Sequence, residues 1–251
     1  PVRPPRRSVK VTHAGTAITT DTTLAQVAVG SGLQAHRRRL CRGALPAGRA
    51  AVNVFILNAG RSGSVSFIRA CSHITNYTAG HETQSNRVGA AHFRYPDNHI
   101  EADNRLAWFL GRLDRAYGDS AFYVHLKRDP VATARSYVRR YDGGIIRTYR
   151  RSILMGRPDN RDPMAVSLDF VDTVTSNIEL FLRDKSHVIE VSLENARYDF
   201  ERFFRAVGAE GDLQAALAEW AASHNAHGRP RLPGKFTRIA RRWRDRLTHR
   251  S

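Results

Sequence analysis

The sequence predicts an α/β fold, in which a parallel β-sheet is flanked by helices on both faces. Three observations support this prediction. Short apolar runs alternate with helical patterns from residue 52 onward, a glycine-containing turn follows the first apolar run, and a proline opens a helix directly after a later one. Strands that alternate with helices pair in parallel within one sheet. The 251 residues suffice for one large domain or for a domain with extensions.

The first half of the expected domain begins with a β-branched apolar run and a helix. Phe67, Ile68 and Cys71 share one face at helical spacing, and a stripe from Leu106 to Leu113 marks a second helix. His99, Glu101 and Asp103 stand just before this second helix, where polar side chains cap helix ends. The expected elements are strands over 52–58 and 74–79, helices over 64–72 and 103–117, and a loop over 83–103.

The second half repeats the alternation. An apolar run that ends at Lys127-Arg128 predicts a buried strand, and Pro130 fits the first turn of the helix that follows. The segment 143–163 combines Gly143-Gly144 with several arginines and is expected to be mostly loop. The remaining expected elements are strands over 121–126 and 187–191, and helices over 130–141, 164–182, 196–207 and 212–223.

The two ends of the chain differ in composition from the region between them. The first segment contains Pro-Pro-Arg-Arg, a Thr/Ala/Gly-rich stretch and Arg37-Arg38-Arg39, and the last is rich in proline, glycine and arginine. We expect 1–50 to be a loosely ordered basic extension, 51–227 to be one domain, and 228–251 to be a basic tail.

Charge and cysteine usage limit the classes of partner. A net charge of +17 attracts polyanions such as nucleotides, sulfated or phosphorylated substrates, nucleic acid or anionic lipid, without ranking them. Cys41 and Cys71 have neither CxxC nor zinc spacing, so we expect no metal site and no disulfide framework. No apolar run is long enough to span a bilayer, and no secretory signal is visible, which favours a cytoplasmic location. Because the chain starts without methionine, a removed N-terminal segment stays open, and the sequence carries no signal for oligomeric state.

The turn after the first strand has the form of a phosphate cradle. The apolar run stops at Asn58-Ala59-Gly60, and Gly60-Arg61-Ser62-Gly63-Ser64 leads into the helix. Backbone N–H groups of such a turn point inward, and a helix N-terminus carries about half a positive charge. A nucleotide-kinase P-loop would need a lysine that is missing here. We therefore predict a grip on a phosphate-like anion, with a purely structural turn as the alternative.

A second candidate anion site follows the strand over 121–126. Arg128 closes that strand, and Ser136 lies eight residues later, two turns into the next helix. An arginine fork and a serine hydroxyl together can hold a terminal phosphate. The alternative is that Arg128 pairs with Asp129 or with a helix end.

Together the two motifs resemble those of the sulfotransferase family. The segment 60–64 is similar to the family's 5′-phosphosulfate loop, and Arg128-Asp129-Pro130 with Ser136 is similar to its 3′-phosphate motif. The resemblance spans about residues 52–195. It implies the α/β fold of the P-loop-containing nucleoside triphosphate hydrolase class. It also implies transfer of a sulfuryl group from 3′-phosphoadenosine 5′-phosphosulfate to a hydroxyl or amine, with no metal.

The resemblance implies a role for each motif position. Arg61 would grip the 5′-phosphosulfate and stabilise charge on the bridging oxygen, while Arg128 and Ser136 would hold the 3′-phosphate. Val65 departs from the family pattern, because a threonine is usual there and the valine side chain cannot donate. Backbone N–H groups and hydroxyls of the loop would make the other contacts, from Gly60, Ser62, Gly63, Ser64, Val65 and Ser66.

The acceptor hydroxyl needs a general base, which typically supplies about 10²–10⁴-fold in rate. Glu82 is our first choice, since Gly80-His81-Glu82 follows the second expected strand; His81 and His92 are rivals, and a salt bridge is the structural alternative for Glu82. The Gly-His-Glu arrangement resembles sugar-acting relatives, so a carbohydrate or glycolipid hydroxyl is favoured. The acceptor pocket would come from 83–103 and 143–163. Either Arg229 or Lys235, near the segment 224–229, could close over the adenosine phosphate.

Two other functions stay open from the sequence. A different P-loop transferase, such as a small-molecule kinase, would need an acidic magnesium ligand at a strand end, and Asp129 is the well-placed acid. A nucleic-acid-binding protein would rest on the arginine clusters at both ends and would lose affinity steeply with salt.

Overall fold

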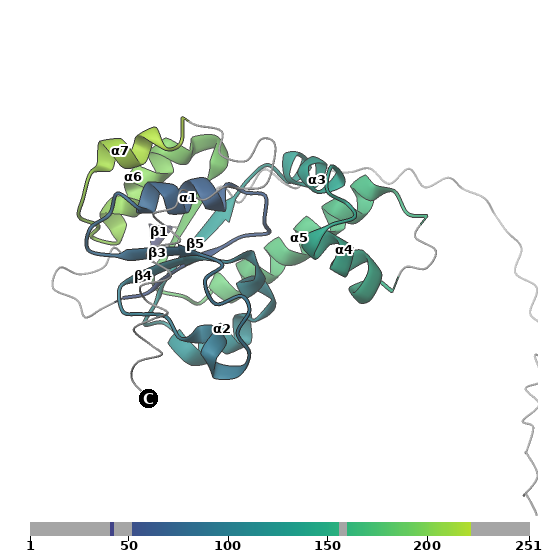
Figure 1. The fold of residues 1–251 in the computed structure, drawn as a ribbon, viewed down its shortest axis with the longest axis horizontal. Coiled ribbons are helices and arrows are strands. Elements are labelled where there is room, and N and C mark those ends of the chain that lie inside the picture. The colour runs from purple at the N-terminus through teal and green to yellow at the C-terminus, as the bar shows by residue number, and fades with distance from the viewer. Residues whose placement is uncertain (1–40, 43–51, 156–159, 222–251) are drawn as a thin grey trace, which may run out of the picture. The chain divides into compact units, whose positions relative to one another are not determined.

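A computed structural model describes residues 41–42, 52–155 and 160–221 of the chain. These residues form a six-stranded sheet with helices on both of its faces (Figure 1). Five strands run parallel, and a two-residue strand joins one edge antiparallel. The predicted α/β class, a parallel sheet flanked by helices, is confirmed.

The elements follow one another in this order along the chain. The strands are β1 (Cys41–Arg42), β2 (Val54–Leu57), β3 (Thr78–His81), β4 (His99–Ala102), β5 (Phe122–Lys127) and β6 (Val188–Ser192). The α-helices are α1 (Ser64–Cys71), α2 (Leu110–Tyr117), α3 (Pro130–Val138), α4 (Gly144–Thr148), α5 (Pro163–Leu182), α6 (Ala196–Ala206) and α7 (Leu213–Ala218). Short 3-10 turns form η1 (Gly89–Phe93), η2 (Asn104–Trp108) and η4 (Leu193–Asn195), and a π turn forms η3 (Tyr149–Ile153).

The strand order indicates which end of the strands is suited to bind a ligand. The order is β1-β6-β5-β2-β4-β3, so β2 lies between β4 and β5. From β2 the chain moves outward to β3, returns to β4, and then crosses to β5 on the other side. In open parallel sheets, ligands bind at the carboxyl ends of the strands where the order reverses. Here that position is the end of β2, followed by the glycine turn.

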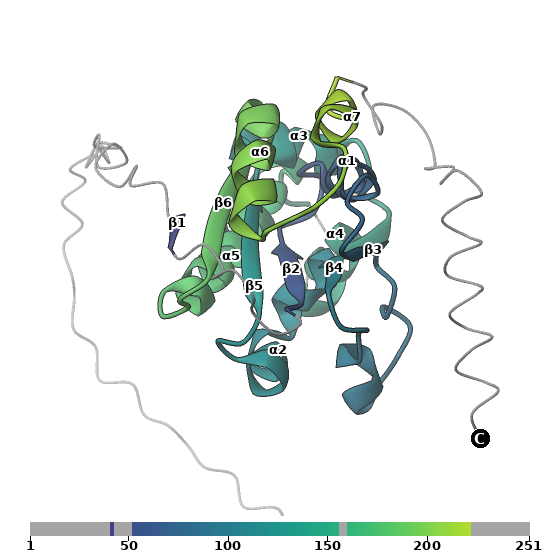
Figure 2. The same cartoon turned by 90° about the vertical axis from the view of Figure 1, so that its left-hand side faces the viewer.

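Alternate side chains of β2 feed two separate cores. Val54 and Ile56 face α1, α6 and α7, where Phe67 belongs to the same buried cluster. Phe55 and Leu57 face the opposite side, together with residues of α2, α3, α4 and α5. Figure 2 shows α6, α7 and α1 gathered apart from α2 and α5. Burial on both faces anchors the central strand, and with it the loop that follows.

The sequence-based assignment was wrong between residues 74 and 117. The second strand is β3, four residues later in the chain than its expected start, and the expected loop over 83–103 contains η1 and the buried strand β4. His99 and Glu101 belong to β4 and are not helix caps. Asp103 does cap η2, because its side chain accepts from the Arg105 N–H at 2.8 Å. The single helix expected over 103–117 is split into η2 and α2 at Phe109, whose backbone is not helical.

Later elements fall close to their expected places. The helix expected over 130–141 ends at Val138, and the arginine-rich part of 143–163 forms α4 and η3 rather than loop. Within the segment expected to be an extension, Cys41 and Arg42 pair with Ile189 and Val188 of β6. The rest of 1–50, and all of 228–251, lie outside the described residues. No helix of the described part is both long and apolar enough to cross a membrane.

Candidate functional site

The loop between β2 and α1 has a backbone that favours glycine. Gly60, Arg61 and Gly63 all have positive φ angles, of 80°, 58° and 92°. A Cβ on Gly60 would lie 2.2 Å from the Tyr137 hydroxyl oxygen, and one on Gly63 would lie 2.7 Å from Leu193 Cδ1. Glycine at these two positions therefore allows both the left-handed turn and the close approach of its neighbours.

Buried polar groups hold this loop in place. The Asn58 Oδ1 atom accepts from the Gly60 N–H at 2.8 Å, and the Ser62 hydroxyl donates to the Gly60 carbonyl at 3.0 Å. From α3, the Tyr137 hydroxyl donates to the Ala59 carbonyl at 2.6 Å. The Ser62 hydroxyl is thus used inside the loop, and the loop is preorganised before any ligand binds.

Helix α1 presents an open N-terminus to the same site. Gly63 is its N-cap and supplies no side-chain hydrogen bond, and the first turn holds no acidic residue. Among the described residues, the N–H groups of Ser64, Val65 and Ser66 have no backbone acceptor. Free N–H groups and the helix dipole attract an anion here. Val65 is buried, so its side chain is directed away from solvent while its N–H stays in this row.

The two predicted anion motifs meet. Arg61 Nε donates to the Ser136 hydroxyl at 3.0 Å, across 75 positions of sequence. Arg128 Nη1 donates to the Arg61 carbonyl at 3.0 Å, across 67 positions. The glycine turn, Arg128 at the end of β5 and Ser136 of α3 therefore form one continuous site at the carboxyl end of β2 and β5. Asp129 is the N-cap of α3, where its Oδ1 accepts from the Ala132 N–H at 2.7 Å.

Four guanidinium groups share this neighbourhood. Burial lowers the pKa of Arg61, and the charges of Arg140, Arg128 and Arg139 lower it further. No carboxylate among the described residues forms an ion pair with any of the four. The site is therefore strongly positive, and an anion is the ligand that lowers its electrostatic energy.

The end of β3 reaches the same loop. The Ser64 hydroxyl lies 3.0 Å from His81 Nε2, so His81 is tied to the first residue of α1. Glu82 follows with a left-handed φ of 56°. Its Oε2 lies 2.6 Å from Arg105 Nη2, in an ion pair whose two side chains are 39% and 37% exposed. The salt bridge weighed as the structural alternative for Glu82 is present, and the carboxylate remains open to solvent.

The Tyr137 hydroxyl is subject to the charges of both Glu82 and Arg61. Burial raises the pKa of the Tyr137 hydroxyl, the Arg61 charge opposes that rise, and the Glu82 charge adds to it. Both charges therefore act on one hydroxyl. The Asn104 amide nitrogen also approaches, at 2.8 Å from where a Gly60 Cβ would stand. The structure thus brings together the loop, α3, and the residue expected to act as base.

A buried carboxylate that the sequence did not single out for the site supports the Glu82 turn. Glu101 is fully buried, and its two oxygens accept from the Thr83 N–H at 2.8 Å and from the Thr83 hydroxyl at 2.6 Å. Its Oε2 also lies 2.9 Å from His99 Nε2, and the Tyr95 ring stacks on His99. Because Thr83 adjoins Glu82, this network holds the left-handed turn. The polar–apolar alternation over 99–102 is the signal that could have revealed it.

His92, the further rival for the base, is placed differently. It is buried in η1, with Nδ1 3.1 Å from the Arg87 carbonyl oxygen, and its ring packs against Phe93 and Phe109. None of these contacts reaches the glycine loop. The segment 224–229 and Lys235 lie outside the described residues.

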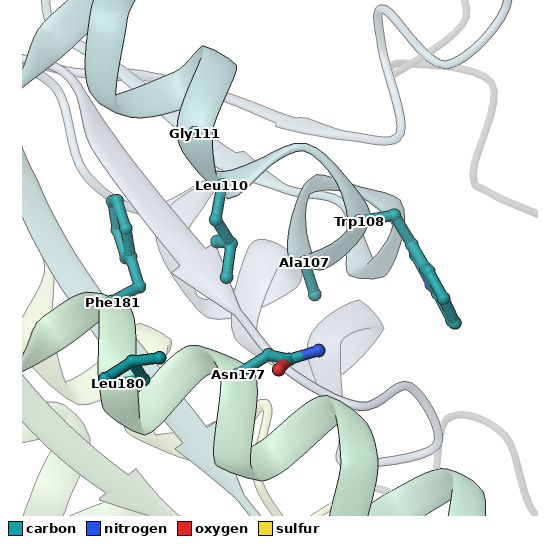
Figure 3. A pocket seen from close by; sticks show the side chains of 7 residues that line it. All are labelled: Ala107, Trp108, Leu110, Gly111, Asn177, Leu180 and Phe181. Carbon is teal, nitrogen blue, oxygen red and sulfur yellow. The ribbon is translucent and has the colours of Figure 1, made fainter.

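A shallow hollow of about 330 Å³ lies elsewhere, between the start of α2 and the end of α5. Figure 3 shows Trp108, Leu110, Leu180 and Phe181 around it, with Asn177 as a polar neighbour. None of the sequence-predicted site residues lines it. Within the described part of the chain, no three His, Cys, Asp or Glu side chains are grouped to hold a metal ion.

Comparison with known proteins adds no assignment. Neither a protein-family model nor a curated protein sequence matches this chain. The functional reading therefore depends on the geometry of the site.

Proposed function

We propose that this chain is a sulfotransferase of the P-loop-like α/β class. It moves a sulfuryl group from 3′-phosphoadenosine 5′-phosphosulfate to the hydroxyl of a carbohydrate or glycolipid acceptor. The observation that carries the proposal is the junction of the two anion motifs, through Arg61 Nε to Ser136 Oγ and Arg128 Nη1 to the Arg61 carbonyl, both at 3.0 Å. A donor with anionic groups on its 5′ and 3′ positions needs two adjacent anion-binding sites.

The residues present suit both ends of that donor. The open N–H groups of α1 and the Arg61 guanidinium suit the 5′-phosphosulfate, and glycine at 60 and 63 keeps the backbone bare for close approach. Arg128, with no carboxylate partner among the described residues, and Ser136 suit the 3′-phosphate. The loop follows the central strand at the switch in strand order, which supports the P-loop-like class.

The reaction is a displacement at sulfur. The acceptor oxygen bonds to sulfur while the bond from sulfur to the bridging 5′-phosphate oxygen breaks, and the leaving oxygen keeps the electron pair. Arg61 and the α1 N–H groups stabilise that charge, as such donors do in loose transition states. Glu82 takes the proton of the acceptor hydroxyl. Arg105 contacts its Oε2, and the Glu82 side chain is 39% exposed, which leaves the carboxylate accessible to an acceptor.

The alternative functions receive less support from the geometry. A kinase would need an acid to hold magnesium, but Asp129 is occupied as the cap of α3. Asp103, directly after β4, is fully buried. Its Oδ1 atom accepts hydrogen bonds from the main-chain N–H and from Nε of Arg105. A nucleic-acid interface would spread its basic groups over a face, whereas these guanidiniums converge on one loop.

A thermal-shift screen of the full chain tests the proposal. We expect 3′-phosphoadenosine 5′-phosphate to raise the melting temperature well above the values found with AMP, with ADP, or with ATP and magnesium. Only that ligand would occupy both anion-binding sites. Arg61→Ala should abolish transfer of labelled sulfuryl groups, whereas Arg115→Ala, on exposed α2, should leave transfer unchanged. Equal shifts in melting temperature with AMP and with the 3′-phosphorylated nucleotide would refute a donor site with separate 5′ and 3′ anion-binding sites.

A further inference from the structure

Two arginines extend the site one helical turn beyond Ser136. Arg139 is the C-cap of α3 and Arg140 follows it, three and four positions after Ser136, so both stand directly after the last turn of that helix. The Arg140 N–H bonds to the Tyr137 carbonyl at 2.8 Å, and the Arg139 N–H bonds to the Arg135 carbonyl at 3.3 Å. Their backbone positions are therefore fixed by the helix end, while both residues are exposed.

These two charges are not neutralised by nearby acids. No carboxylate in the described segments pairs with Arg139 or Arg140, and the next acid along the chain, Asp142, pairs with Arg150. By contrast, Lys127 is held by both Glu179 and Glu190. Ser136, three and four positions before them, accepts from Arg61 Nε at 3.0 Å, and the charges of Arg139 and Arg140 lower the pKa of Arg61.

The donor does not account for this surplus of charge. Arg61 with the α1 N-terminus serves one anionic end of the donor, and Arg128 with Ser136 serves the other. Tyr137, three positions before Arg140, donates its hydroxyl to the Ala59 carbonyl of the glycine loop at 2.6 Å. The first residue of α1 after that loop, Ser64, lies 3.0 Å from His81, which adjoins Glu82, the residue proposed to activate the acceptor. The end of α3 therefore borders the acceptor side of the site as well as the donor side.

We infer that the acceptor carries an anionic group, a carboxylate, sulfate or phosphate, and that Arg139 and Arg140 bind it. The inference rests on the proposed sulfotransferase function and narrows its substrate class to acidic, hydroxyl-bearing acceptors. The bound anion would neutralise the exposed pair and keep the reacting hydroxyl near Glu82. The competing assignment gives both arginines to the donor 3′-phosphate.

A matched pair of saccharides separates these assignments. The probes are an unsulfated chondroitin tetrasaccharide, which bears carboxylates, and its carboxyl-reduced neutral counterpart. Each is titrated by calorimetry into the full chain saturated with 3′-phosphoadenosine 5′-phosphate. We expect the acidic probe to bind about 10- to 100-fold more tightly, as charge-assisted hydrogen bonds imply. The doubly substituted R139Q/R140Q chain should lose that preference, while Arg135→Gln, an exposed neighbour on α3, should keep it.

Each outcome decides between the assignments. If R139Q/R140Q weakens nucleotide binding as much as Arg128→Ala does, the pair belongs to the donor and the inference is overturned. It is also overturned if the two probes bind equally, or if neither binds. Failure of the unsubstituted chain to bind the nucleotide would instead refute the proposed function, which keeps the two failures distinguishable.

Discussion

Replacing Arg128 with alanine separates its two contributions to the proposed donor site. In the structure, Arg128 Nη1 donates to the Arg61 carbonyl at 3.0 Å, which steadies the glycine loop. In the proposed function, its remaining donors bind the 3′-phosphate. The first contribution affects any ligand of the loop, whereas the second affects only ligands that carry a 3′-phosphate.

The magnitudes follow from the kinds of hydrogen bond. Loss of the loop contact should cost about 1 kcal/mol, which lowers affinity about fivefold for AMP and for its 3′-phosphorylated form alike. Loss of a charge-assisted bond to phosphate should cost about 2–3 kcal/mol more, or about 30- to 150-fold, for the 3′-phosphorylated nucleotide alone. This extra loss of affinity for the 3′-phosphorylated nucleotide should become smaller as the salt concentration rises, because Arg128 is only partly buried.

Calorimetric titration of both nucleotides into both chains measures this extra loss as a double cycle. Arg61→Ala is the contrasting variant, because it should weaken both nucleotides by similar factors. Urea unfolding of each variant checks that the fold is kept. If Arg128→Ala lowers the affinity for the two nucleotides equally, Arg128 only stabilises the loop. The proposal that it binds the 3′-phosphate then fails.

Three further predictions concern the loop, the base and a buried histidine. Gly60→Ala should lower the free energy of unfolding by about 2–4 kcal/mol through backbone strain and contact with Tyr137, whereas Gly111→Ala, in open space on α2, should be neutral or stabilising; urea melts of both check this. Glu82→Gln should reduce transfer about 10²–10⁴-fold with nucleotide affinity kept, and an unchanged rate would move the base to a histidine. Burial lowers the pKa of His125 to about 3, so the unfolded chain binds more protons below about pH 6.5. Stability should therefore be full above that pH and fall by about 2 kcal/mol on acidification to about pH 5, and His125→Phe should remove that part of the slope; an unaltered slope would contradict a neutral buried His125.

Strand β4 illustrates where sequence reasoning fell short. His99 and Glu101 alternate with Ile100 and Ala102, and only the apolar pair faces the helices α1, α6 and α7. The polar pair is buried as well, which a reading of residue types disfavours because buried polar groups need partners. Thr83 donates to Glu101, and the Tyr95 ring stacks on His99. These contacts exist only once β3 and β4 lie side by side.

The environment of the expected base was likewise beyond the sequence. Glu82 could be chosen because it follows a strand, but its pairing with Arg105 depends on the turn of η2 after β4. Arg105 is in turn held by the buried Asp103 through two hydrogen bonds. The same tertiary arrangement ties His81 to Ser64 and keeps His92 among aromatic rings.

The chain's own chemistry determined the alternation of strands and helices and the positions of the two candidate anion-binding turns. Those features are local: glycine suits the positive φ at positions 60 and 63, a proline opens α3, and apolar runs become strands. Only the tertiary structure decided that Arg61 would meet Ser136, that Glu82 would pair with Arg105, and that Arg139 and Arg140 would stay without acidic partners among the described residues. Such contacts depend on the strand order, which brings together residues up to 75 positions apart, and no local pattern encodes that distance.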